Sequence, residues 1–221
     1  DTSLWRDAGD LLLDGLTGQD AFDAIYSGVS DVLESGDTLV SMGGDHSVAY
    51  PAILAHAEEY EKLSILQVDA HTDLYEDFGG NPFSHASPFA RLLETGKVDR
   101  LVQVGIRTLT THQREQVKRY GVDVHEMRDL SGVGTIAFDG PVYLSVDLDG
   151  LDPAFAPGVS HHEPGGLSTR QVIDLIHTFK GQLIGGDVVE LNPHRDVNGM
   201  TAMVASKLLK EMMARMIHDQ A

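Results

Sequence analysis

Short apolar runs alternate along the chain with segments of helical periodicity. This alternation predicts an α/β fold with three layers, α/β/α, around a mostly parallel, doubly wound sheet. Near-continuous apolar runs are typical of strands that helices cover on both faces. Five runs are expected to be strands: Thr38–Met42, Leu63–Val68, Arg100–Gly105, Val142–Val146 and Gln182–Gly185.

Three longer segments are expected to be helices. Asp20–Glu34 gathers its apolar residues on one face. Thr169–Phe179 follows a capping-box pattern that starts at Ser168, and a third helix is expected over about Thr201–Ile217. Because the sequence has no internal repeat, low-complexity tract or linker-like stretch, residues 1–221 are expected to form a single domain.

Charged residues follow four of the predicted strands, in the segments Gly43–Ser47, Asp69–Asp73, Asp147–Pro153 and Asp187–Glu190. In an open parallel sheet, ligands bind beyond the carboxyl ends of the strands. We therefore expect one site at this edge of the sheet, with side chains delivered by four strands.

Two of these segments space their charged residues by two positions. An extended backbone would point Asp69, His71 and Asp73 in one direction, and Asp147 and Asp149 would repeat the pattern. Alone, the first motif is more often a polar loop, and the second could cap a turn. The joint occurrence of both motifs after strands favours a metal site.

The expected metal ligands are two imidazoles and four carboxylates: His46, Asp69, His71, Asp73, Asp147 and Asp149. So many carboxylates cannot stay ionised in a cleft unless cations neutralise them. Oxygen ligands favour hard divalent ions, and the imidazoles shift the preference from Mg²⁺ or Ca²⁺ towards Mn²⁺. Six ligands exceed the need of one ion that also binds water, so we expect two Mn²⁺ ions per subunit.

Composition narrows the classes of partner. Asp and Glu number 34 against 16 Lys and Arg, for a formal charge of −18, which argues against nucleic acid. No apolar run reaches the roughly 18–20 residues that span a bilayer. There are no cysteines, so thiolate ligands and nucleophiles are excluded. No signal peptide is recognised, and a cytoplasmic location is expected.

The motifs at the strand ends resemble those of the ureohydrolase family, which contains arginase and agmatinase. The resemblance rests on Gly-Gly-Asp-His-Ser at 43–47, Asp-Ala-His-Thr-Asp at 69–73 and Ser-Val-Asp-Leu-Asp-Gly-Leu-Asp-Pro at 145–153. Three further stretches look like the plant-type arginase branch: Ser84–Arg91, Phe155–Gly166 and Asp196–Ala205. Family members are longer, so the sheet is expected to lack their first strand and the domain to be short at its amino terminus.

The resemblance implies roles for these residues. One manganese would bind His46, Asp69, Asp73 and Asp147, and the other would bind His71 and Asp149, with Asp69 and Asp147 bridging the two ions. Glu190 falls where the family has its guanidinium-binding carboxylate, and His85 falls where it has a proton-shuttling histidine. Asp73 could accept the proton of the attacking water, and Asp149 or His85 could protonate the leaving amine.

The reaction implied is hydrolysis of a small cationic guanidino compound to urea and an amine. The loop with Asn81, Ser84 and His85 offers neutral donors that could bind a carboxylate, or these residues simply make a turn. L-Arginine is favoured over agmatine because this loop is close to the plant-type arginase pattern. Agmatine, guanidinobutyrate and guanidine remain alternatives, since the metal core suits them all. By resemblance a homo-oligomer, trimer or hexamer, is expected.

Two other readings are weaker. Zinc deacetylases share this fold, but their sites hold one metal and lack the histidine and aspartate that a second metal needs. This chain has both, as His46 and Asp73. A catalytically inactive metal-binding subunit is disfavoured because every expected ligand is present. The roles of His161 and His162 stay open.

Overall fold

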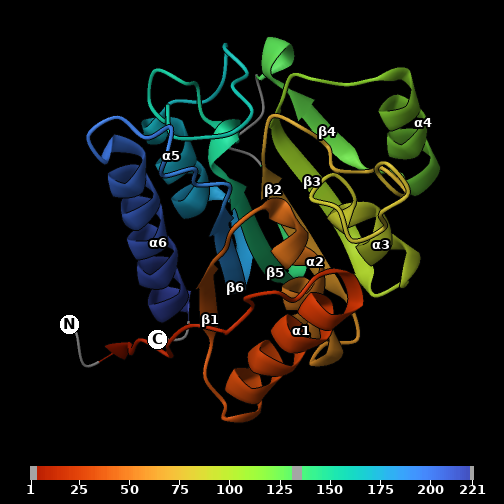
Figure 1. The fold of residues 1–221 in the computed structure, drawn as a ribbon, viewed down its shortest axis with the longest axis vertical. Helices are drawn as coiled ribbons and strands as arrows, with labels where there is room; N and C mark the ends of the chain where they lie inside the picture. Colours follow the sequence, from red (N-terminus) through yellow and green to blue (C-terminus); the bar gives the residue numbers. More distant parts are fainter. Residues whose placement is uncertain (1–3, 131–135, 220–221) are drawn as a thin grey trace.

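The computed structural model describes residues 4–130 and 136–219, and one six-stranded sheet runs through them (Figure 1). Every pair of neighbouring strands in the described sheet is parallel, in the order β1-β6-β5-β2-β3-β4. The strands are β1 (Leu39–Met42), β2 (Leu63–Val68), β3 (Val98–Ile106), β4 (Asp123–Glu126), β5 (Ala137–Asp147) and β6 (Lys180–Val189). The predicted parallel α/β sheet is therefore confirmed.

The helices of the described residues are α1 (Gly18–Glu34), α2 (Ala49–Glu58), α3 (Pro88–Glu94), α4 (Thr111–Tyr120), α5 (Thr169–Thr178) and α6 (Met200–Asp219). The three predicted helices are confirmed as α1, α5 and α6, and the capping box at Ser168 is formed with Gln171. Helix α2 was not predicted because it is buried on most of its surface and so lacks an amphipathic stripe. Strand β4 was missed because its sequence, Asp-Val-His-Glu, is polar and half-buried at the sheet edge.

Helices cover both faces of the sheet and form three layers (Figure 1). On one face, α5 and α6 pack on residues such as Leu66, Leu144 and Val146. On the other face, α2 and α3 pack on Leu63 and Ile65. Among the described residues, no helix combines the length and apolar character needed to cross a bilayer.

The face under α2 changes character along each central strand. In β2, the apolar positions Leu63 and Ile65 are followed on the same face by Gln67 and then by Asp69. In β6, the strand continues beyond the predicted Gly185, because β1 pairs with it as far as Val188 and β5 as far as Val189. Asp187 therefore lies inside the strand rather than after it. The sheet thus has an apolar centre and a buried polar region towards its carboxyl edge.

Leu144 tests how strongly the central strand supports the fold, because its side chain is fully buried in β5. Leu144→Ala is expected to lower the free energy of unfolding by about 2–5 kcal/mol, the cost of lost burial and a residual cavity. Urea denaturation measures the change. The matched control is Leu12→Ala, since Leu12 is 89% exposed and should change stability by less than about 0.5 kcal/mol. Equal effects of both substitutions would contradict this packing.

Candidate functional site

The first predicted ligand segment follows β2 and bends sharply. The strand ends at Val68, and the backbone turns near His71 and enters the left-handed region at Asp73, with a φ of 49°. The expectation of an extended run from Asp69 to Asp73 is therefore wrong. The three side chains still converge, because the bends direct them to one point. A left-handed non-glycine residue is strained and is frequently found at functional sites.

The second segment is a tight turn, so the predicted extended alternation is wrong here too. Asp147 ends β5, and a 3₁₀ turn, η5 (Leu148–Gly150), follows directly. The Asp147 carboxylate accepts a hydrogen bond from the Asp149 amide at 2.7 Å. Gly150 lies against β2, where an added Cβ would stand 2.8 Å from the backbone nitrogen of Asp69. Only glycine allows this turn to approach Asp69 so closely.

His46 comes from a third segment, the short turn η2 (His46–Val48) after β1. The Asp45 side chain caps this turn by accepting from the Ser47 amide at 3.0 Å. The backbone amide of His46 donates to Glu190 Oε1 at 2.9 Å, which joins the ends of β1 and β6. Glu190 also has a left-handed backbone, with a φ of 66°. The predicted guanidinium-binding carboxylate is therefore held at the edge of the ligand cluster.

The structure brings all six predicted metal ligands together in two groups. In the first, His46 Nδ1 lies 3.0 Å from Asp73 Oδ2, 3.1 Å from Asp69 Oδ2 and 3.2 Å from Asp147 Oδ2. In the second, His71 Nδ1 lies 3.2 Å from Asp149 Oδ2 and 3.5 Å from Asp69 Oδ1. The two groups thus share Asp69, one oxygen facing each imidazole. Bridging by Asp147 stays a prediction.

The electrostatics of the cluster are those of a cation site. Burial, followed by the charges of Asp149 and Asp69, raises the pKa of Asp147 well above its usual value. Burial opposes protonation of His71, but its contacts with Asp149 and Asp69 outweigh that cost and raise its pKa to about 12. Burial and mutual repulsion thus disfavour the charged form of Asp147, and the His46 imidazole beside it opposes that effect. Divalent cations would relieve the same repulsion.

The buried Nδ1 nitrogen of His46 indicates where a cation would bind in this cluster. His46 is 1% exposed, and although three carboxylate oxygens surround its Nδ1, none forms a hydrogen bond with it. An unsatisfied polar atom at this depth is costly unless something else binds it. A cation between Nδ1 and the three oxygens would satisfy all four atoms. The described residues therefore fit the metal-dependent chemistry that the sequence predicts.

A row of buried polar residues beneath the ligands was missed. Gln103, Gln67, Ser145 and Asp187 lie in register across β3, β2, β5 and β6, and all four are fully buried. Gln103 donates to Gln67 Oε1 at 2.6 Å, and Gln67 donates to Asp69 Oδ2 at 2.7 Å. The sequence does carry a signal for it, because a polar residue, Gln67 or Ser145, precedes Asp69 and Asp147 by two positions in mostly apolar runs. We call these four residues the polar row.

Arg107, just after β3, was also missed. Among the described residues, its guanidinium donates to backbone carbonyls alone: those of Gly105, Asp149, Gly150, Leu151 and Glu163. Burial lowers the pKa of Arg107, while the carboxylates nearby, Asp149 first, oppose that change. Arg107 thus fixes the turn that carries Asp149 and ties it to the loop at Glu163.

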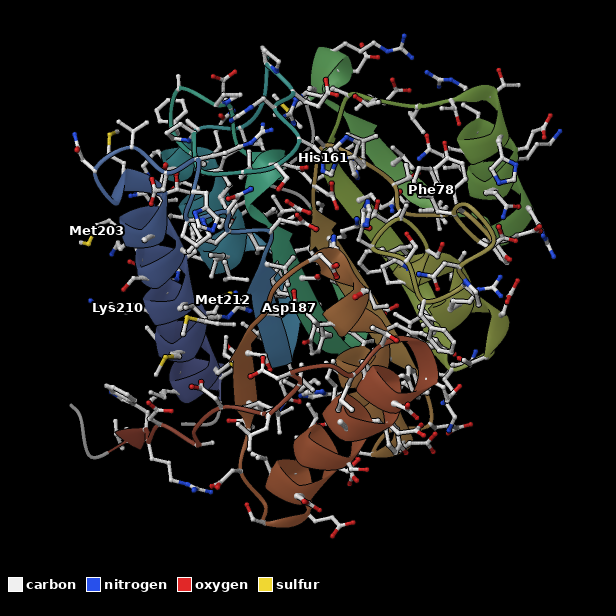
Figure 2. All side chains as sticks on the ribbon, viewed as in Figure 1. Phe78, His161, Asp187, Met203, Lys210 and Met212 are labelled. Atoms are coloured by element: carbon white, nitrogen blue, oxygen red, sulfur yellow. The ribbon has the colours of Figure 1, made fainter. Side chains whose placement is uncertain are left out.

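The predicted substrate residues lie on the loops above the cluster. The ring centroids of His71 and His161 are 6.0 Å apart, and those of His161 and His85 are 5.7 Å apart. Figure 2 shows His161 and Phe78 on these loops. His161, whose role the sequence left open, therefore connects the second ligand group with His85. His162 instead contacts the Pro157 carbonyl at 2.7 Å and so belongs to its own loop.

Asn81 and Ser84 make the turn that precedes His85. Asn81 Oδ1 accepts from the Phe83 amide at 3.0 Å, and Ser84 Oγ accepts from the Ala86 amide at 3.2 Å. Both contacts use the side chain as an acceptor, so neither consumes the amide or hydroxyl donor. Their assignment to substrate binding stays a prediction.

Known proteins resemble this chain in sequence and in structure. The model of the arginase family matches residues 3–214. The mitochondrial arginase of Medicago truncatula is 52% identical over 184 residues, covering 79% of this chain, and an agmatinase of Bacillus anthracis is 33% identical over 213 residues, covering 94% of this chain and 73% of its own length. This chain spans about half, 54%, of the length of the Medicago relative.

Solved structures agree with these matches. An arginase from Medicago truncatula superposes with a TM-score of 0.86 at 46% identity, covering 91% of this chain and 67% of its own. The proclavaminate amidino hydrolase of Streptomyces clavuligerus gives a TM-score of 0.84 at 32% identity, covering 95% and 75%. The three-layer fold is therefore shared with these proteins.

The shared position of Asp69 can be tested against that of Asp147. Asp69→Asn is expected to weaken divalent metal binding at both ligand groups by at least about tenfold, because the carboxylate faces both imidazoles. Asp147→Asn should weaken metal binding at both ligand groups if Asp147 bridges the two ions, and only at the group of His46 if it does not. Equilibrium dialysis with metal analysis measures the dissociation constants of both groups. Asp31→Asn, on the exposed surface of α1, is the control, and normal binding by Asp69→Asn would refute the shared role.

Proposed function

Because the chain belongs to the arginase family, we propose that it hydrolyses the guanidinium group of L-arginine to urea and ornithine, with two Mn²⁺ ions per subunit. The observation that carries the proposal is the pair of ligand groups that share Asp69 around the orphaned His46 nitrogen. Two ions need a shared carboxylate and separate imidazoles, and both are present. The relatives named arginase and agmatinase support the reaction class.

His46, Asp69, Asp73 and Asp147 would hold one ion, and His71 and Asp149 would complete the other with the shared carboxylates. Oxygen-rich ligands with two imidazoles and no sulfur suit Mn²⁺. When bound, such a pair of ions supplies a water of lowered pKa as nucleophile. The guanidinium needs this help because resonance makes it a poor electrophile.

The chain's own residues would orient the substrate and move protons. Glu190, at the edge of the cluster and largely buried, would pair with the guanidinium and hold its carbon over the ligand groups, a proximity effect. Asp73 would accept the proton that the attacking water loses. His85, two ring contacts away from His71 through His161, or Asp149 would protonate the departing amine.

The preference for arginine over agmatine rests on the loop that contains Asn81 and Ser84. Their remaining donors could bind an α-carboxylate, which agmatine lacks. The higher identity to plant arginase than to bacterial agmatinase points the same way. Agmatine is the second candidate, because the formal charge of −18 attracts a dication more strongly than a monocation. We also propose that the subunits assemble as a trimer or hexamer.

The reaction and substrate are tested by one experiment. Protein loaded with Mn²⁺ is expected to release urea from L-arginine, with a higher kcat/KM than for agmatine, and to contain two manganese ions per chain. Colorimetric urea measurement across arginine, agmatine, guanidinobutyrate and guanidine decides the substrate. A preference for agmatine would reverse the choice within the family. Full activity with a single zinc ion, or no urea from any compound, would overturn the proposed function.

Glu190 is tested by Glu190→Gln. The glutamine oxygen can still accept from the His46 amide, so the backbone contact stays while the charge is lost. Breaking a buried charge pair costs about 3–5 kcal/mol, so kcat/KM for arginine should fall by roughly two to four orders of magnitude. Manganese content should not change. Glu58→Gln, at an exposed ion pair with Lys97, is the control, and loss of manganese from Glu190→Gln would place Glu190 among the metal ligands.

A further inference from the structure

The polar row contains a buried carboxylate that the proposed reaction does not use. Asp187 is fully buried in β6, where Figure 2 labels it within the sheet. Its Oδ1 accepts from the Ser145 hydroxyl at 2.7 Å, and its Oδ2 accepts from the Tyr143 hydroxyl at 2.9 Å. Burying a carboxylate among apolar strands is unfavourable. We therefore expect Asp187 to have a role that compensates for the cost of its burial.

Ser145 links Asp187 to the ligand cluster. Its Oγ lies 2.9 Å from His46 Nε2, on the opposite side of the ring from the nitrogen that faces the carboxylates. The contact is fixed in space because Ser145 is itself fully buried and lies beside Asp187 in the register of β5 and β6. Asp187, Ser145 and His46 thus form one continuous line of polar contacts.

The chemistry of the three groups fixes the direction of these hydrogen bonds. The Ser145 hydroxyl donates to Asp187 Oδ1, beside the Tyr143 hydroxyl that donates to Oδ2, and a hydroxyl has a single hydrogen to donate. Ser145 therefore donates to Asp187 and must accept from His46, so the proton of the neutral ring is on Nε2. Nδ1 is then left with its lone pair, directed at the three carboxylates of the first ligand group. That is the form of histidine that binds a metal through Nδ1.

We infer that Asp187 is a positioning residue, which acts through Ser145 to hold His46 in the metal-binding tautomer and so sets the affinity of the first ligand group. The inference rests on the two-ion site of the proposed function, but it is independent of the substrate. His71 has no contact of this kind with Asp187 among the described residues. The effect of Asp187 is therefore selective for one of the two ions.

The alternative is that the polar row only stabilises the sheet. In that case, loss of the Ser145 hydroxyl would change the stability of the fold without favouring one ion over the other. Selective weakening of one metal is the result that a purely structural role does not produce. The test therefore measures the two metal affinities separately from the stability.

The experiment titrates Mn²⁺ into the full, metal-free chain and follows electron paramagnetic resonance, which distinguishes isolated ions from a spin-coupled pair. In Ser145→Ala, one of the two dissociation constants is expected to rise by roughly 10- to 100-fold, while the other changes little. At the Mn²⁺ concentration that gives the coupled pair in the unchanged chain, the variant should show isolated ions. The matched control is Ser64→Ala, which removes a buried hydroxyl from a different strand, β2. This variant should still show the spin-coupled pair of Mn²⁺ ions.

Asp187→Asn and the double variant test the line of contacts. Asp187→Asn is expected to weaken binding of the same Mn²⁺ ion. The double variant should bind that ion no more weakly than Ser145→Ala does, because both substitutions interrupt the same line of hydrogen bonds. Circular dichroism checks folding, and Ser145→Ala decides the inference if Asp187→Asn does not fold. Unchanged constants, equal weakening of both ions, or additive effects in the double variant would overturn it. An unchanged chain that binds fewer than two ions would instead refute the proposed function.

Discussion

Repulsion among four carboxylates at one sheet edge is the constraint on which this structure depends. Three of their oxygens lie within 3.2 Å of a single imidazole nitrogen, at a depth where solvent gives little screening. The surrounding fold is built to tolerate this crowding. The guanidinium of Arg107 lies behind Asp149, Gln67 donates to Asp69, and two site residues hold left-handed backbone conformations. The hydrogen bonds hold the turns and the carboxylates in place, and the left-handed residues carry a strain that the surrounding structure must support.

The sheet and the gathering of the candidate metal ligands at its edge could be predicted from the sequence, because both depend on local pattern. Buried parallel strands give apolar runs, and the carboxyl ends of such strands meet at one edge. The ligands could thus be grouped before any distance was known. The backbone path between them could not, since the bend at His71 and the turn after Asp147 are set by contacts with neighbouring strands.

The parts that sequence reasoning missed depend on partners far away in the chain. The polar row is formed by residues from four strands, which become neighbours only through the register of the sheet. Arg107 resembles any surface arginine until the carbonyls around it are known. Strand β4 owes its place to pairing with β3, not to its own polar sequence. In each case tertiary context outweighs local propensity.

The bonding of Arg107 has an evolutionary consequence. Because the Arg107 guanidinium binds the main-chain oxygen of Glu163, this contact does not depend on which side chain stands at that position. Mutations can therefore exchange the chemical groups on the loop that carries His161 while the loop keeps its anchorage beside the cluster. A protein built in this way can diversify what it recognises without rebuilding the frame that holds its reactive centre.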